Sequence, residues 1–263
     1  AYRYRHLKKK KINGAVWLGG LLLAVIGILL QTNRSFFATL GEEGAKSCCE
    51  KELDFLRQKD KRLAEVIDRI GPVHRTVDTD LFSAVVHHII GQQISTKAQA
   101  TIWQRMCDAL GTVHAKTVLG AGVEGLQALG ISYKKAEYIT DFAQKVLDGS
   151  FDIEAVWSMP DDEAIKALSS LNGIGVWTAE MILLFCMQRP NILSYGDLAI
   201  HRGMRMVYHH RKIDRKLFEK YRRRLSPYCS VASLYFWAVA GGALPDMKDY
   251  APKTKKQTER QKK

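Results

Sequence analysis

The sequence has few cysteines, and their spacing shows no pairing pattern. There are five, an odd number, and most stand alone within apolar helical patterns: Cys48, Cys49, Cys107, Cys186 and Cys229. This usage argues against a disulfide-stabilised secreted domain and favours a reducing compartment. The adjacent pair Cys48-Cys49 has no second pair to complete a zinc site, so we do not expect structural zinc.

The sequence also lacks convincing stretches in which apolar and polar residues alternate, the pattern that predicts a strand. Apolar residues recur at helical spacing instead, first at Leu53, Leu56, Leu63, Ile67 and Ile70, and we expect Gly71-Pro72 to stop that helix. We expect further helices over 81–90, 95–110, 133–147, 161–168, 177–187, 198–208, 215–225 and 230–240, with short helical turns over 113–129. With 263 residues and 46% hydrophobic content, the chain can bury one large core or two small ones. The predicted fold class is all-α.

Acidic residues are too few to balance the basic ones. The net charge is +13, and residues 201–224 hold ten Lys and Arg against Asp214 and Glu219. A basic surface favours a polyanionic partner, because binding releases counterions. For 201–224 we favour nucleic acid over a merely solvated helix face. For the residues after Tyr250, with six Lys and Arg against Glu259, we favour a disordered tail.

The chain is organised around the stretch from Pro160 to Arg202. At its centre Gly173 and Gly175 bracket Ile174, between an acidic helix start and the nearly all-apolar run from Trp177 to Met187. We expect Ile174 to plug into the core while the glycine N–H groups, at the start of a helix, face a phosphate. The alternative is a plain turn between two helices.

The loop from Arg189 to Asp197 decides between these interpretations. A hairpin between helices, a loop containing Pro190 and Gly196, and then Asp197 resemble the signature of the helix-hairpin-helix (HhH-GPD) DNA glycosylase superfamily. The string Gly-Ile-Gly-Val-Trp-Thr-Ala from Gly173 looks most like the 3-methyladenine (alkylpurine) branch. The resemblance covers roughly residues 53–243. It implies two helical lobes with the active-site cleft between them.

The resemblance implies that Asp197 is the catalytic residue. Cleavage of an N-glycosidic bond gives the sugar oxocarbenium character, which a nearby carboxylate stabilises while it positions or deprotonates the attacking water. Asp197 also stands where a helix N-cap would. The two roles are compatible, because a cap fixes the carboxylate in place.

Lysine is absent between Lys166 and Lys212. Trp177 occupies the position where bifunctional relatives carry a lysine that forms a Schiff base, so the resemblance implies base removal by water alone. An indole suits a cationic, electron-poor alkylated purine, although Trp177 could instead be a core aromatic. The resemblance extends the base pocket to Trp237 and Met181, and we add Tyr195 as a candidate. Met181 stands where relatives often have a tyrosine, which leaves the base preference open.

The remaining site residues concern DNA and ions. In this family a residue at the turn after Gly91 wedges into the duplex once a nucleotide is flipped out, which implies Gln93 with Gln92 beside it; a polar interhelical turn is the alternative. The DNA-contact candidates are Gly173, Gly175, Thr178, Gln92, Gln93, Ser95, Lys134 and Lys135. The resemblance also implies that the carbonyls of Ser169, Leu171 and Ile174 hold a structural monovalent cation, Na⁺ or K⁺. We expect no required cofactor, and no iron–sulfur cluster because no four-cysteine cluster follows the hairpin.

The N-terminal segment fits this picture least. Residues 3–11 are basic and residues 15–30 run without a polar side chain, slightly short of the roughly 20 residues that span a bilayer. A membrane anchor and a non-native extension both remain open. We expect residues 1–50 to form this segment, 51–247 the helical glycosylase domain, and 248–263 a basic disordered tail.

Together these features predict a monofunctional glycosylase for alkylated purines of the 3-methyladenine type, acting in base excision repair. Its partner would be double-stranded DNA with damaged bases. We expect a cytoplasmic, nucleoid-associated monomer, with a membrane tether through residues 15–30 as the alternative. Two other functions stay open. One is a glycosylase for another damaged or mismatched base; the other is a non-catalytic DNA-binding module.

Overall fold

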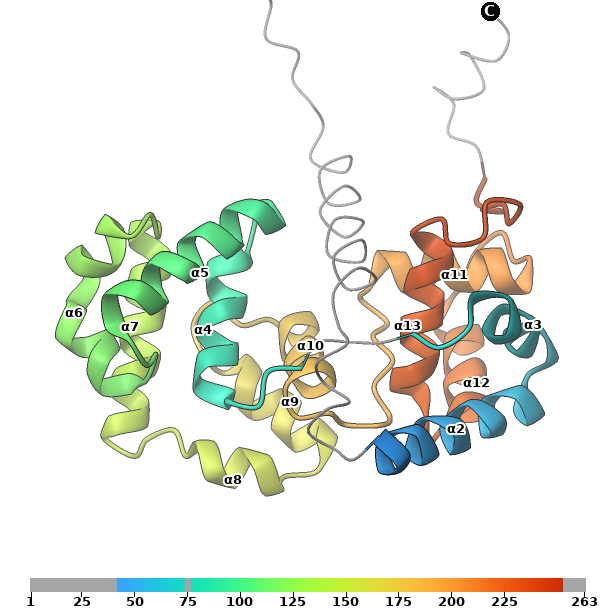
Figure 1. The fold of residues 1–263 in the computed structure, drawn as a ribbon, viewed down its shortest axis with the longest axis horizontal. Coiled ribbons are helices and arrows are strands. Elements are labelled where there is room, and N and C mark those ends of the chain that lie inside the picture. The colour runs from blue at the N-terminus through green and yellow to red at the C-terminus, as the bar shows by residue number, and fades with distance from the viewer. Residues whose placement is uncertain (1–41, 74–76, 253–263) are drawn as a thin grey trace, which may run out of the picture.

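The protein is built from helices, as predicted. The computed structural model describes residues 42–73 and 77–252, and within these ranges it contains twelve helices and no strand (Figure 1). The helices are α2 (Glu42–Lys59), α3 (Lys61–Ile70), α4 (Leu81–Gly91), α5 (Thr96–Leu110), α6 (Ala115–Ala128), α7 (Tyr133–Leu147), α8 (Ile153–Ser158), α9 (Asp161–Ser169), α10 (Val176–Phe185), α11 (Leu198–Tyr208), α12 (Arg215–Leu225) and α13 (Cys229–Ala240). The all-α fold class is confirmed.

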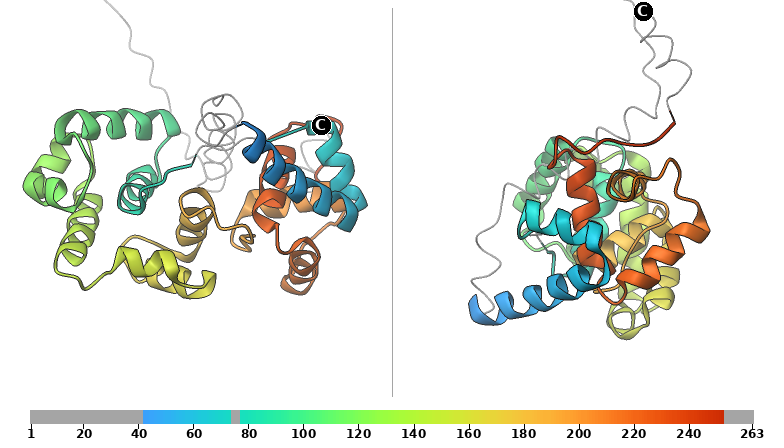
Figure 2. Two further views of the ribbon diagram at one scale, coloured as in Figure 1. Left: turned by 60° about the horizontal axis from the view of Figure 1, so that its bottom comes forward. Right: turned by 90° about the vertical axis from the view of Figure 1, so that its right-hand side faces the viewer.

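The helices form two groups with α10 between them. Helices α4 to α7 lie on one side, and α2, α3 and α11 to α13 lie on the other (Figures 1 and 2). Helix α10 packs on α9 and α4, while α11 packs on α13 and α3. The chain therefore crosses between the two groups through α10 and the loop that follows it. That crossing carries the residues of the predicted active site.

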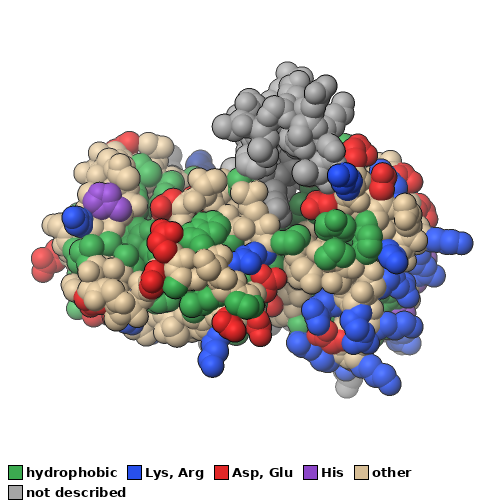
Figure 3. Space-filling model, turned by 90° about the horizontal axis from the view of Figure 1, so that it is seen from below, with side chains coloured by type: hydrophobic (Ala, Val, Ile, Leu, Met, Phe, Trp, Pro, Cys, Tyr) green, Lys and Arg blue, Asp and Glu red, His purple; other side chains and the backbone are tan. Residues whose placement is uncertain are grey.

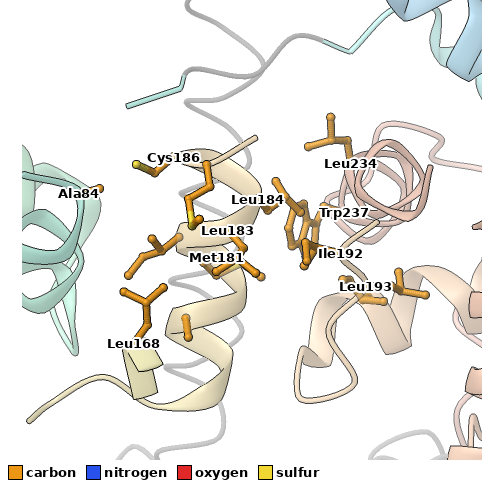
Figure 4. Packing of buried hydrophobic residues seen from close by; sticks show 14 of the residues in the cluster. Ala84, Leu168, Met181, Leu183, Leu184, Cys186, Ile192, Leu193, Leu234 and Trp237 are labelled. Atoms are coloured by element: carbon orange, nitrogen blue, oxygen red, sulfur yellow. The ribbon is translucent and has the colours of Figure 1, made fainter. Parts of the chain in front are cut away.

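The central helices α10 and α13 are apolar on nearly all sides, with Glu180 of α10 the one charged residue in the two helices, which is the pattern of largely buried helices. Every residue of α13 from Cys229 to Ala240 except Val231 is buried. Figure 4 shows Trp237 of α13 pointing toward α10, beside Leu184 and Ile192. The core therefore continues from α10 across to α13 and joins the two groups.

The two helices α11 and α13 approach each other at Gly203. A Cβ atom built on Gly203 would fall on the backbone carbonyl of Phe236. Only hydrogen occupies that space, so the backbones of the two helices can pack directly. This contact holds the helix that begins at Asp197 against the core.

The prediction of a single helix through Leu53 and Ile70 is wrong. The helix is broken at Asp60, which has an extended backbone and accepts the N–H of Leu63 at 3.0 Å as the N-cap of α3. The Asp60 carboxylate is buried, and Oδ2 also accepts from Tyr208 Oη at 3.1 Å and Arg224 Nη1 at 2.9 Å. The break thus links α3 to α11 and α12, and apolar spacing alone does not reveal it.

The predicted turns over 113–129 form one assigned helix, α6, interrupted at Gly122, whose φ is 65°. At the other end of the chain, Asp249 binds Arg205 through both carboxylate oxygens at 2.7 Å. The first residues of the predicted tail are therefore held against α11.

The apolar run 15–30 and residues 253–263 lie outside the described ranges. Within those ranges, no helix has the length and apolar character to cross a membrane.

Candidate active site

Asp197 lies at the start of α11 with both carboxylate oxygens bonded. Oδ1 accepts the backbone N–H groups of Ala199 at 2.8 Å and Ile200 at 2.9 Å. Oδ2 accepts the indole N–H of Trp177 at 2.9 Å. The side chain is 2% exposed. The helix start and the indole together provide the hydrogen-bond donors that a buried carboxylate needs. The expected N-cap role is confirmed.

Trp177 is the first-turn residue of α10 that reaches Asp197. Its ring is 41% exposed, and its neighbour Val176 and the residue after the acid, Leu198, are exposed too. The interpretation of Trp177 as an ordinary core aromatic therefore fails. The exposed apolar groups border the carboxylate, where an incoming sugar or base can contact them.

The loop before Asp197 is fastened to α13 by two serines. Ser230 Oγ accepts the N–H of Ile192 at 2.9 Å and donates to the carbonyl of Arg189. Ser233 Oγ donates to the carbonyl of Ile192 at 3.0 Å. These bonds satisfy backbone groups of a loop that is largely buried, which would otherwise be costly. They fix the segment that carries the acid.

The three other residues predicted for a base pocket do not share one environment. Trp237 is 6% exposed and stacks on Phe185 with ring centroids 5.7 Å apart. Met181 is buried on α10 in the same region (Figure 4). Tyr195 instead lies against α11 and α12, with Phe218 at 5.0 Å and the Arg215 guanidinium at 4.6 Å from its ring. These ring contacts place Tyr195 in the packing of the C-terminal helices.

The hairpin has the predicted geometry. Ile174 is buried, while Gly175 and the preceding Asn172 are exposed. Gly173 has a φ of 85°, and a Cβ there would lie 2.5 Å from Cδ2 of Tyr138. Gly175 is the N-cap of α10, and among the described residues no heavy atom lies within 4 Å of a Cβ built on it. The start of α10 at Gly175 is therefore open for an anion, while Gly173 is required by the turn. Thr178, one turn in, is buried.

The turn after α4 is joined to this hairpin. Gln92 Nε2 donates to the carbonyl of Gly173 at 2.6 Å. Gln93 is exposed with a φ of 58°, an uncommon conformation for a residue with a side chain. Ser95 caps α5 by accepting the N–H of Ala98 at 3.2 Å. Of the two glutamines, Gln92 supports the hairpin and Gln93 projects at the tip.

The two lysines predicted to contact DNA differ. Lys134 is exposed, 5.8 Å from the ring of Tyr138. Lys135 is partly buried, and its ammonium donates to the carbonyls of Ile90 at 2.8 Å and Gln92 at 2.5 Å. Burial lowers the pKa of Lys135. Its ammonium therefore holds the end of α4, and Lys134 is the better placed of the two for a phosphate.

Of the three residues whose carbonyls are predicted to hold a cation, Ser169 ends α9, and Leu171 and Ile174 lie in the turn that follows. The Leu171 carbonyl accepts the Ile174 N–H at 3.1 Å. A carbonyl oxygen has two lone pairs, so this bond leaves room for a cation. Oxygen donors of this kind suit hard cations. The Leu171 carbonyl can therefore serve as one ligand, and the cation site at Ser169, Leu171 and Ile174 stays a prediction.

The basic residues of 201–224 gather over α12, where Figure 3 shows Lys and Arg side chains grouped at one end of the molecule. Several are tied up in ion pairs, such as Arg224 with Asp60 and Arg222 with Glu219. The exposed cations for which the described residues provide no ion pair are Arg211, Lys212, Lys216, Lys220 and Arg223. We call this set the α12 basic surface. Arg215 is not in this set, because it pairs with Glu219 while its guanidinium lies over the Tyr195 ring.

The sequence from Val86 to Pro227 matches the family model of the HhH-GPD superfamily base excision DNA repair proteins. That match spans more than half of the chain. The chain belongs to the HhH-GPD superfamily.

Relatives within the HhH-GPD superfamily include 3-methyladenine glycosylases, as the resemblance predicted. The chain is 27% identical to a putative DNA-3-methyladenine glycosylase, YfjP, of Bacillus subtilis, over 66% of this chain and 64% of that protein. It is 25% identical to DNA-3-methyladenine glycosylase 1 of Schizosaccharomyces pombe, over 72% of this chain and 85% of that protein. The chain thus spans slightly less than two thirds of the first relative and most of the second.

Solved HhH-GPD structures share the arrangement. A DNA-3-methyladenine glycosidase from Bacillus halodurans superposes with a TM-score of 0.67 at 29% identity, covering 78% of this chain and 94% of that one. The 3-methyladenine DNA glycosylase of Schizosaccharomyces pombe in complex with abasic DNA superposes with a TM-score of 0.63 at 22% identity, covering 75% and 99%. At that identity the second likeness shows the fold alone.

Two residues close to Asp197 were not singled out from the sequence, Glu180 and Ser194. Ser194 Oγ donates to Glu180 Oε2 in a short hydrogen bond. Burial raises the pKa of Glu180, and the negative charge of Asp197 raises it further, whereas the Ser194 bond and Arg215 act in the opposite direction. One signal could have found Glu180, because it is the only charged residue in the apolar helix α10.

Proposed function

We propose that this protein is a monofunctional DNA glycosylase that hydrolyses the N-glycosidic bond of alkylated purines of the 3-methyladenine type. The observation that carries the proposal is the buried carboxylate of Asp197, bonded by the exposed indole of Trp177. Matches to DNA-3-methyladenine glycosylases support the choice of substrate. The substrate is a base flipped out of damaged double-stranded DNA, because the glycosidic bond is not accessible within the stack.

The bonding of Asp197 favours an electrostatic role. Its two oxygens accept three N–H groups, so its negative charge is held in one orientation. Such a preorganised charge stabilises the positive charge that develops on the sugar. An alkylated purine is already cationic and a good leaving group. Water then attacks a sugar that has become electrophilic, and no general acid is needed.

The absence of an amine at the Trp177 position favours hydrolysis without strand cleavage. A Schiff base to the sugar requires a lysine or an N-terminal amine close to C1′. Here the residue that contacts the acid is an indole. Its exposed face can stack on a cationic base, an interaction that favours electron-poor purines over neutral ones.

DNA binding would use the hairpin and the α12 basic surface. The open start of α10 at Gly175 provides backbone N–H groups for a phosphate. Gln93, projecting with its left-handed backbone, fits the role of the residue that fills the vacated stack. The cation proposed at the hairpin carbonyls would stabilise the same turn. We propose a monomer, with no cofactor required for chemistry.

The decisive experiment is incubation of the purified protein with methylated DNA, followed by identification of the released bases. We expect 3-methyladenine to be released and the DNA strand to remain intact. Release of a deaminated or mismatched base from suitable duplexes, with no methylated purine, would favour the other-lesion alternative. DNA binding with no base release from any of these duplexes would favour a non-catalytic module.

A further inference from the structure

Two side-chain bonds run in parallel from α10 to the segment that carries the acid. Trp177 donates to Asp197 at 2.9 Å, and Glu180 accepts from the hydroxyl of Ser194. The donor and acceptor on α10 are three residues apart, so they share one face of the helix. Their partners, 194 and 197, are also three residues apart. The acid is thus attached to α10 at two successive points.

The second of these bonds is made at a cost. Ser194 is fully buried, and Glu180 is partly buried in a helix that is otherwise uncharged. Removing a carboxylate from water is unfavourable unless it is well bonded. The nearby charge of Asp197 adds repulsion, which Arg215 partly offsets. A residue needed only to fill space here would be apolar.

The position of Ser194 explains what the bond does. Its carbonyl accepts the N–H of Asp197 at 3.4 Å, which closes the turn before α11. Two residues earlier, Ile192 is bonded to Ser230 and Ser233 on α13. The loop is therefore fixed to α13 at Ile192 and to α10 at Ser194. Loss of the second attachment would free the turn that sets the position of the acid.

We propose that Glu180 is a positioning residue that acts through Ser194 to hold the carboxylate of Asp197 against the indole of Trp177. This inference rests on the proposed function, because it assigns Glu180 to the same reaction. Displacing a reacting group by a fraction of an ångström lowers the rate of the chemical step more than it lowers substrate binding. The side chain need not touch the substrate.

The test compares Glu180→Ala, Ser194→Ala and Glu180→Gln in single-turnover base release from methylated DNA at saturating protein. We expect the two alanine variants to lower the rate constant by roughly 10-fold or more, with the dissociation constant for DNA changed less than twofold. Glu180→Gln should recover most of the loss, since its amide oxygen can accept the Ser194 hydroxyl. Glu154→Ala, an exposed acid on α8, is the matched control.

A second readout does not depend on activity. The indole N–H resonance of Trp177, assigned by comparison with Trp177→Phe, reports the bond to Asp197 in the free protein. We expect Glu180→Ala to shift or broaden this resonance, and Glu154→Ala to leave it unchanged.

Failure of the wild-type protein to release any base would overturn the proposed function, while this resonance would still test whether Glu180 positions Asp197. An unchanged rate and resonance in Glu180→Ala, or a loss in Glu180→Gln as large as in Glu180→Ala, would overturn the inference.

Discussion

The indole N–H of Trp177 donates to Oδ2 of Asp197 across 2.9 Å, from the first turn of one helix to the N-cap of another. Because Oδ1 is already occupied by the N–H groups of α11, the indole completes the bonding of the carboxylate. The aromatic residue that borders the site thus also orients the acid. Binding and chemistry are coupled through one side chain.

The first prediction concerns the mechanism. Borohydride treatment during the reaction with damaged DNA should trap no covalent protein–DNA complex. A Schiff base needs an amine, and the residue that contacts Asp197 at this position is Trp177, which has none. Denaturing electrophoresis of labelled DNA gives the measurement. A bifunctional glycosylase treated in parallel supplies the positive control. A trapped adduct would show that an amine reaches the sugar, and Lys212 would be the first residue to test.

The second prediction concerns the hairpin. Gly175→Asp should weaken DNA binding regardless of sequence, because it places a negative charge where we propose a phosphate. The side chain enters open space, so the variant should fold. Gly175→Ala adds a Cβ without charge and is the control. The measurement is the DNA affinity of both variants over a range of salt concentrations. Equal affinities for the two variants would remove the hairpin from the interface.

The hairpin turn and the helix start at Asp197 could be predicted because their signals are local. The hairpin glycines and the N-cap Asp197 are each recognisable within a few residues, and their geometry depends on the helix starts they form. Lys135 was harder, since its ammonium bonds carbonyls at Ile90 and Gln92, far away in sequence. Tyr195 was equally hidden, because its ring partners belong to α11 and α12.

The helix break at Asp60 could not be predicted for the same reason, because its partners are distant in sequence. Apolar spacing continues through it, and the residues that bond its buried carboxylate, Tyr208 and Arg224, lie 148 and 164 positions later. Glu180 differs in that a lone charge in an apolar helix is visible in the sequence. Its partner Ser194 could not be identified without the path of the loop.

The third prediction concerns the packing of α11 on α13. Gly203→Ala should destabilise the protein by about 1–3 kcal/mol, because the new methyl meets the Phe236 carbonyl and the backbone must shift. Gly120→Ala is the matched control. It lies within α6 with open space around its Cβ, and should stabilise by about 0.5–1 kcal/mol. Chemical denaturation measures both. A neutral Gly203→Ala would show that the helices are less closely packed.

The fourth prediction concerns acid stability. Burial, with a smaller contribution from His87, lowers the pKa of His88 from 6.5 to about 4. The unfolded chain therefore takes up a proton before the folded protein does, so the free energy of unfolding should fall as pH drops from about 6.5 to about 4. His88→Gln should flatten this slope. Denaturation at several pH values makes the comparison, and an unchanged slope would contradict the prediction.

The last prediction separates charge from bonding at Asp197. In Asp197→Asn the amide oxygen can still accept from the start of α11, but the amide nitrogen then faces the indole N–H, another donor. Losing that bond should cost about 1–2 kcal/mol of stability. Trp177→Phe loses the same bond and keeps the negative charge, so it is the matched control.

If the charge stabilises the oxocarbenium-like transition state, Asp197→Asn should lower the rate of single-turnover base release by at least about 10²-fold. Trp177→Phe should lower that rate much less, at a similar melting temperature. DNA binding by the Asn variant should persist or tighten, because a carboxylate repels the polyanion. Base release by the folded Asn variant at a rate near that of the wild-type protein would leave Asp197 as a helix cap and move the search for the catalytic group elsewhere.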